Sequence, residues 1–214
     1  MPAVHRNLPD MRRKVKKQED QLMADKKAII VLAGGEVSGS GAAMGKLLKK
    51  GVLFSNYTPG TVLDGSVVEE QLVRLAPAGV AEAVEQGTPL MVVELDNADA
   101  DALNAAMETI LDAADRRTII AVAGSNALAL YGQGVNAKAG TVDRAAHAKD
   151  ILPTLAAVGE FPLTDQCTGA VLYQALKNPN PKLEEIAKLK EALARMEGAL
   201  ARDNREPWDK HDCA

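Results

Sequence analysis

The chain has 214 residues, of which 47% are hydrophobic, 25% are charged and only 3% are aromatic, and its formal net charge is −4. This composition is typical of a globular protein with a core of Ala, Val, Leu and Ile, and its acidic balance does not favour nucleic acid or a membrane surface as a partner. Two cysteines, Cys167 and Cys213, do not make a disulfide framework. With no apolar run of about 20 residues and no apolar leader visible, we expect a cytoplasmic protein.

Three segments differ in composition. Residues 1–22 are basic and polar and predict a disordered N-terminal extension, or alternatively a basic arm that contacts an acidic partner. Residues 23–178 alternate apolar runs with helical patterns, which predicts one compact α/β domain. Residues 179–214 combine a strongly amphipathic helix with a polar tail.

The predicted elements of the middle segment alternate along the chain. The expected strands are 28–32, 52–58, 89–95 and 117–124, and the expected helices are 39–51, one within 67–87, 100–115 and 150–159. Helices between strands imply a mostly parallel sheet that is covered on both faces, a three-layer α/β/α sandwich. Ligands of such sheets usually bind beside the carboxyl ends of the strands. The loops "GGEVSGSG", "DNADAD" and "AGSN" are therefore the first places to look for a site.

The C-terminal segment predicts a helix over 181–205. Its apolar residues follow a 3-4-3-4 spacing that suits a short coiled coil, and they are Ile186, Leu189, Leu193, Met196 and Leu200. Charged pairs four residues apart, such as Glu191 and Arg195, support the helix. A terminal helix that docks on its own domain is the alternative.

Four stretches of the middle segment occur in a familiar order. They are "AIIVLAGG" (28–35), "MGKLLKKGVLFSNYTPGTV" (44–62), "AAMETILDAADRRTIIAVAGSN" (105–126) and "AKDILPTLAAVGEFPLTDQCTGAVL" (148–172). Together they make the chain resemble a shortened member of the alkaline phosphatase superfamily, which includes sulfatases, type I phosphodiesterases and cofactor-independent phosphoglycerate mutases. The last stretch is the most specific, because it places Asp150, Pro153, Thr154, Gly159 and Gly169 as the family's closing motif does.

The resemblance implies an alkaline-phosphatase-like core, in which Asp and His residues hold two metal ions beside a Ser, Thr or modified Cys nucleophile. In this chain the matching positions carry other residues. Ala33 replaces the aspartate that ends the first strand, Leu63 replaces the nucleophile, and Ala100 replaces the histidine partner of Asp96. The family's Asp-His pair falls on Ser125 and Asn126.

The residues left for chemistry are few. Glu36 and Asp96 are the candidate metal ligands, and Thr61, Asp64 and Ser66 are the candidate catalytic residues. The acidic cluster at 96–101 is also typical of a helix N-cap. The loop 34–41 could cradle a phosphate at a helix N-terminus, or it is a flexible connection.

These substitutions predict a degenerate homologue that is a non-catalytic binding or interaction protein without a cofactor. Its expected partner is a protein or a second copy of the chain, bound through the 181–205 helix, and a small anion is a further expected ligand. The alternative is a metal-dependent hydrolase or phosphotransferase that acts on phosphate or sulfate esters. That enzyme would need a divalent metal, Mg, Mn or Zn, because paired metals activate the nucleophile and stabilise the leaving oxygen.

Overall fold

The computed structural model of the chain describes residues 26–63, 65, 67, 71–96, 98–177 and 179–203, and only the backbone of 179–184 and 201–203. The chain divides into two units, Met1–Lys177 and Asn178–Ala214. The predicted extension at 1–22 and the polar tail lie outside the described residues. None of the described helices is both long and apolar enough to cross a membrane.

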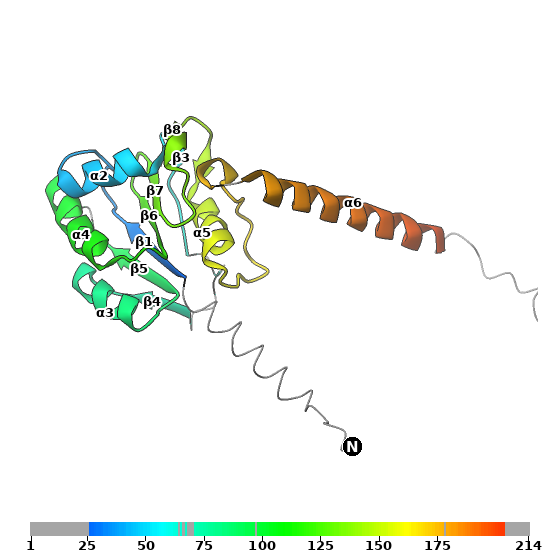
Figure 1. Ribbon diagram of the computed structural model, residues 1–214, viewed down its shortest axis with the longest axis horizontal. Helices are drawn as coiled ribbons and strands as arrows, with labels where there is room; N and C mark the ends of the chain where they lie inside the picture. The colour runs from blue at the N-terminus through cyan, green and yellow to red at the C-terminus, as the bar shows by residue number, and fades with distance from the viewer. Residues whose placement is uncertain are drawn as a thin grey trace, which may run out of the picture. The chain divides into compact units, whose positions relative to one another are not determined.

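The first unit is an α/β structure (Figure 1). Seven strands form one mixed sheet in the order β4-β5-β1-β6-β7-β2-β8, and β3 pairs with β9 in a small second sheet. Most neighbours in the large sheet are parallel, and only β7 runs antiparallel to its neighbours β6 and β2. The predicted α/β class with a mostly parallel sheet is confirmed. The strands are β1 (Lys27–Leu32), β2 (Val52–Phe54), β3 (Tyr57–Thr58), β4 (Leu72–Arg74), β5 (Leu90–Glu94), β6 (Thr118–Ala123), β7 (Leu128–Gly132), β8 (Thr141–Val142) and β9 (Ala146–His147), and the helices are α2 (Ala42–Lys50), α3 (Val80–Glu85), α4 (Ala100–Ala113) and α5 (Ile151–Gly159).

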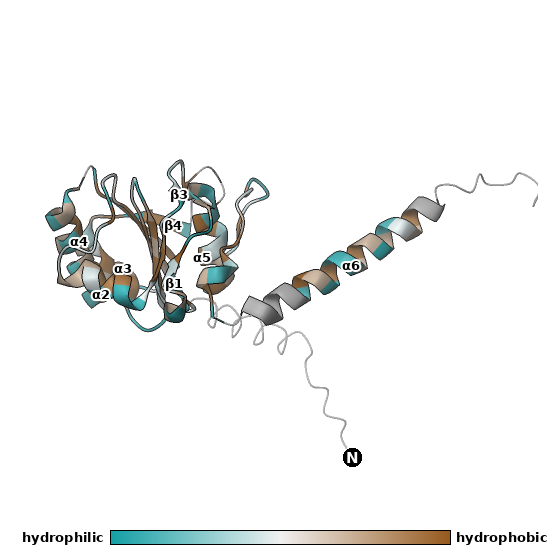
Figure 2. Cartoon of the chain, turned by 90° about the horizontal axis from the view of Figure 1, so that it is seen from above, coloured by the Kyte–Doolittle hydropathy of each residue, from teal (hydrophilic) through white to brown (hydrophobic). Residues whose placement is uncertain are grey.

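Both faces of the central strands are buried. Side chains of a strand alternate between the two faces, so Ile29 and Ile120 belong to the core under α2, α3 and α4. Ile30 and Ala121 belong to the core under α5. Figure 2 shows the two helical layers on opposite sides of the sheet, with hydrophobic colour concentrated between them. The continuous apolar runs of β1, β5 and β6 are therefore explained by burial on two sides.

Two predicted elements differ from the structure, and the strand β7 was not predicted. The expected strand 52–58 breaks at Ser55 and Asn56, so that β2 joins the large sheet and β3 the small one. The expected helix within 67–87 is confined to α3, because β4 precedes it as an edge strand and Pro77 disfavours a helical conformation at Ala76. A strand missed by the prediction, β7, follows the "AGSN" turn directly.

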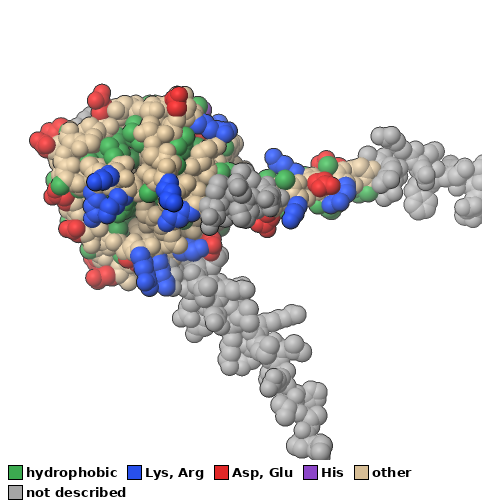
Figure 3. Space-filling view, turned by 45° about the horizontal axis from the view of Figure 1, so that its top comes forward, with side chains coloured by type: hydrophobic (Ala, Val, Ile, Leu, Met, Phe, Trp, Pro, Cys, Tyr) green, Lys and Arg blue, Asp and Glu red, His purple; other side chains and the backbone are tan. Residues whose placement is uncertain are grey.

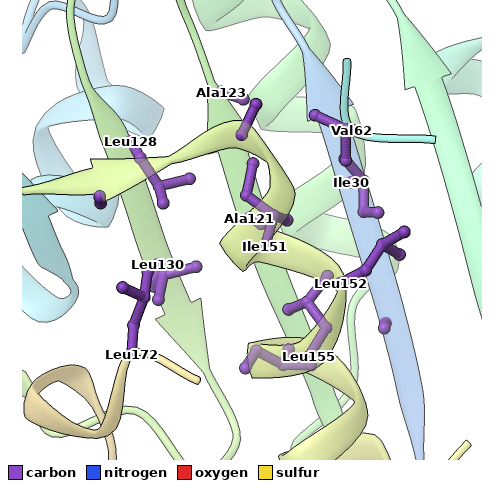
Figure 4. Close-up of a cluster of buried hydrophobic side chains, with 14 of the residues drawn as sticks. Ile30, Val62, Ala121, Ala123, Leu128, Leu130, Ile151, Leu152, Leu155 and Leu172 are labelled. Atoms are coloured by element: carbon purple, nitrogen blue, oxygen red, sulfur yellow. The ribbon is translucent and has the colours of Figure 1, made fainter. Parts of the chain in front are cut away.

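Helix α5 is held against the sheet by apolar packing and by a buried polar clamp. Ile151, Leu152 and Leu155 point at the sheet residues in Figure 4 and are at most 1% exposed. The carboxylate of Asp150, only 4% exposed, accepts hydrogen bonds from the backbone amides of His147 (2.9 Å) and Ala170 (2.8 Å). The carboxylate thus ties the segments before and after α5 to the start of the helix.

Thr154 completes this clamp one turn later. Its fully buried hydroxyl donates to the carbonyl of Asp150 (2.6 Å) and accepts from the amide of Leu172 (2.9 Å). Gly169 lies so close to Lys149 that a β-carbon there would overlap the Lys149 carbonyl. Asp150, Thr154 and Gly169, three residues of the motif that suggested the family, therefore have a structural role in this chain.

The second unit contains α6 (Pro179–Asp203), close to the predicted 181–205. Its apolar stripe is exposed, with Leu189, Leu193, Met196 and Leu200 retaining 59–64% of their accessible surface. Glu191 and Arg195 lie four residues apart with a 3.9 Å contact. The hydropathy colours along α6 alternate between brown and teal, as expected of an amphipathic helix (Figure 2).

We expect replacement of Thr154 by Val to lower the free energy of unfolding by about 1–3 kcal/mol, because the buried amide of Leu172 loses its acceptor. The matched control is Thr109→Val on the exposed face of α4, where the hydroxyl bonds a carbonyl of its own helix. The control is expected to change stability by about 0.5 kcal/mol or less. Urea denaturation of both variants measures the difference, and equal effects would show that the clamp does not hold α5.

Candidate functional site

The carboxyl ends of the parallel strands β1, β5 and β6 lie side by side, since β1 pairs with both of the others. Three connections leave this edge: residues 33–41 after β1, residues 95–99 after β5, and residues 124–127 after β6. In parallel α/β sheets such an edge is the usual place for a ligand. The predicted metal ligands and most of the replaced positions fall on these three connections.

Backbone groups join the three connections directly. The amide of Ala98 donates to the carbonyl of Ala33 (3.3 Å), and the amide of Ser125 donates to the carbonyl of Gly35 (2.9 Å). A β-carbon at Gly35 would overlap the carbonyl of Ala98, so only glycine permits this approach. We call this set of backbone contacts the carboxyl-edge joint.

Asn126 adds a side chain to the carboxyl-edge joint. Its Oδ1 accepts from the amide of Val37 (2.8 Å) and its Nδ2 donates to the carbonyl of Val37 (3.4 Å). The "AGSN" stretch is the turn of a hairpin between β6 and β7, closed by a bond from the amide of Gly124 to the carbonyl of Ala127. At the two positions matching the family's Asp-His pair, Ser125 thus contributes its backbone and Asn126 fastens the first loop.

The acidic residues near this edge are exposed. Glu36 and Asp96 both lie on the surface. The N-cap interpretation is confirmed for Asp99, whose carboxylate accepts from the amide of Ala102 (2.8 Å) at the start of α4. Ala100 is the first residue of that helix. Among the residues that the structure describes, no group of three or more His, Cys, Asp or Glu side chains could hold a metal ion.

The position matching the family's nucleophile is part of the core. Leu63 is half-buried and packs against the cluster under α5. Thr61 is exposed on the approach to it. The other two candidate catalytic residues, Asp64 and Ser66, lie outside the described residues. A leucine that packs into the core offers no group that could attack phosphorus or sulfur.

The N-terminus of α2 is capped by another helix. The N-cap residue of α2, Gly41, has no side chain that could accept a hydrogen bond. Instead, Oδ1 of Asn104 from α4 accepts hydrogen bonds from the amides of Ala43 (3.0 Å) and Met44 (3.2 Å). A phosphate cradled by the loop 34–41 would use these same amides. In this structure the carboxamide of Asn104 occupies these amides and thereby docks α2 on α4.

Two further titratable residues, Tyr57 and His147, belong to the small sheet of β3 and β9. Burial raises the pKa of Tyr57 to about 12, so its phenol stays protonated at neutral pH. His147 is exposed and forms a capping box with Asp150 at the turn before α5. Tyr57 is explained by its packing in the core under α5, and His147 by its cap at the turn before that helix.

Two asparagines that organise this edge, Asn104 and Asn126, have roles that the sequence did not predict. The resemblance marks Asn126 as the replacement of a histidine, and Asn104 lies within a helical pattern that gives no signal of capping a different helix. Both bonds join residues at least 60 positions apart. Only the folded arrangement of β1, α2 and α4 brings these groups together.

Comparison with models of known protein families finds none that matches this chain. Comparison with curated proteins likewise finds no match.

We expect Asn126→Ala to lower the free energy of unfolding by about 1 kcal/mol, because the amide of Val37 loses its acceptor. The neighbouring Ser125→Ala is the control, since Ser125 contributes its backbone amide, which alanine retains. Chemical denaturation of both variants gives the comparison. If Ser125→Ala were as destabilising as Asn126→Ala, the side chain of Asn126 would not be what fastens the loop.

Proposed function

We propose that the chain is a shortened alkaline-phosphatase-like core that acts as a non-catalytic interaction protein and pairs with a second copy of itself through α6. The observation that carries the proposal is the exposed stripe Leu189, Leu193, Met196 and Leu200. Removing apolar surface from water is the main driving force of association. Four large apolar side chains in one row on a helix favour a helical partner.

The core supports a non-catalytic role because the groups at its family-equivalent positions are engaged in packing. Leu63 packs into the core and Asn126 bonds the backbone of Val37. Catalysis at either position would require a residue with a reactive side chain and a different conformation of the loop. The proposal therefore assigns the first unit to presenting and stabilising a partner-binding element, and ranks a metal-dependent hydrolase second.

The charges beside the stripe favour a parallel pair of helices. With Ile186, Leu193 and Leu200 at heptad position a, Leu189 and Met196 occupy position d. Glu185 and Lys190 then flank the seam at positions g and e. In a parallel coiled coil a g residue of one chain faces the following e residue of its partner. Glu185 of one copy would meet Lys190 of the second, which adds an attractive charge pair to the apolar seam.

Truncation of the stripe tests this pairing. We expect the full chain to sediment as a dimer at micromolar concentration and Leu193→Ala/Met196→Ala to raise the dimer Kd by at least about 100-fold, since each buried Leu or Met contributes about 1.5–3 kcal/mol. Alanine has a high helix propensity, so a loss of dimer affinity reports on the apolar contacts between the two helices. Sedimentation velocity over a range of concentrations measures the change.

The matched control is Lys188→Ala/Glu191→Ala, which truncates two exposed side chains outside the stripe and leaves the net charge unchanged. This variant is expected to remain dimeric. A monomeric wild-type chain, with α6 docked on its own core or free, would contradict the proposal. Equal weakening by the control variant would also contradict it, because the seam would then not be the interface.

A further inference from the structure

A cavity of about 390 Å³ opens at the opposite edge of the sheet, where β6 begins and β7 ends. Its walls come from four separate parts of the first unit: α2, the C-terminal turn of α4 with residues 114–118, the end of β7, and the segment at residue 177. This volume lies within the range typical of small-molecule sites. None of the residues discussed at the carboxyl edge lines it.

Three cationic side chains from different elements line this cavity. They are Lys46 on α2, Arg116 after α4, and Lys177 at the end of the unit, and all three are exposed to solvent. On a chain with a net charge of −4, such a convergence creates a local positive potential. The visible face of the first unit in Figure 3 carries several Lys and Arg groups, with acidic groups mostly around its rim.

The carboxylate among the described lining residues, Asp115, does not neutralise these cations. Its oxygens accept from Lys27 Nζ (2.8 Å), the hydroxyl of Thr118 (2.7 Å) and the amide of Arg117 (2.9 Å). Partial burial of the carboxyl opposes ionisation, but these three donors together hold its pKa below the ordinary value. Because Lys27 already balances the charge of Asp115, the three lining cations are left to attract a ligand.

The floor of the cavity is fixed by the backbone. The amide of Gln133 donates to the carbonyl of Thr118 (2.9 Å), and the amide of Lys177 donates to the carbonyl of Gly134 (2.7 Å). Gly132 has a φ of 103° and lies against Thr118, where a β-carbon would overlap the Thr118 carbonyl. The backbones that carry Gln133 and Lys177 are thus held in place before any ligand binds, which lowers the entropic cost of binding.

The walls also offer neutral groups. Oε1 of Gln133 is buried and has no hydrogen-bond partner among the described residues. An unsatisfied buried polar oxygen is rare in folded proteins, and as an acceptor it would be satisfied by a ligand hydroxyl or another donor. Leu111, Ala114 and Tyr131 supply an apolar and aromatic side of the same cavity.

We propose that this cavity binds a small organic phosphate, with the phosphate among Lys46, Arg116 and Lys177 and the apolar body against Leu111, Ala114 and Tyr131. Arg and Lys are the side chains that most often bind phosphate, Arg through a bidentate fork and Lys as a point charge. This phosphate site is distinct from α6 and from the carboxyl-edge joint, so its test is independent of the proposed pairing through α6.

Isothermal titration calorimetry of the full chain with phenyl phosphate, at low ionic strength, tests the site. We expect saturable one-to-one binding that is at least tenfold tighter than that of inorganic phosphate, because the ring adds apolar burial. The triple variant Lys46→Ala/Arg116→Ala/Lys177→Ala is expected to weaken phenyl phosphate at least tenfold. Circular dichroism establishes that the triple variant is folded. The single variant Arg116→Ala is expected to weaken phenyl phosphate binding several-fold and provides an independent measurement.

The matched control is Lys49→Ala/Lys138→Ala/Arg144→Ala, which removes the same number of exposed cations from elsewhere on the first unit. Its affinity is expected to stay within twofold of the wild type. Equal losses in both triple variants would show a general charge effect and overturn the site. Absence of saturable binding would also overturn it, and equal affinity for inorganic phosphate would overturn the assignment of an organic ligand.

Discussion

Burial of both faces of β1, β5 and β6 is the constraint on which the rest of the structure depends. Every residue of β6 is buried, as are nearly all residues of β1. Strands this apolar need a layer on each side. On one side, α2, α3 and α4 follow the strands as crossover helices. On the other side α5 must be brought back onto the sheet, and the buried carboxylate of Asp150 with the hydroxyl of Thr154 holds it there.

The two edges of the sheet differ in how closely the connecting segments approach one another. At the carboxyl edge, glycine and alanine let the loops after β1, β5 and β6 approach until their backbones bond one another. The side-chain oxygens of Asn104 and Asn126 accept hydrogen bonds from the backbone amides of Ala43 and Val37, respectively. At the opposite edge the chain leaves a cavity lined by cations. The first edge thus stabilises the fold, whereas the second retains space and charge for a ligand.

The sequence predicted elements well where one local property decides the structure. Continuous apolar runs located β1, β5 and β6, and apolar spacing located α4, α5 and α6. The prediction failed where a short segment changes partners, as at Ser55 and Asn56, or where a strand follows a tight turn, as β7 follows Asn126. Hydrophobic periodicity alone does not reveal such a hairpin. In this chain the turn between its strands also resembles a family motif, which favoured a different interpretation.

The site was less predictable than the fold for a physical reason. The resemblance predicts position by position which residues stand where the family has metal ligands. The role of each such residue in this chain, however, depends on groups that lie far along the sequence. Asn126 bonds Val37 across 89 positions. Lys46, Arg116 and Lys177 likewise have no common sequence pattern, because three different elements carry them to one cavity. Such convergence is visible only once the sheet order is known.

The central claim is that the carboxyl edge of the sheet is a structural joint and not a metal centre. The most direct test is to incubate the full chain with manganese, zinc and magnesium, dialyse it, and count metal per chain by elemental analysis. The account predicts that no metal is retained in stoichiometric amount. Two tightly held metals per chain would contradict it, because the two-metal site would then have been rebuilt from other ligands and the protein would belong among the metal-dependent hydrolases.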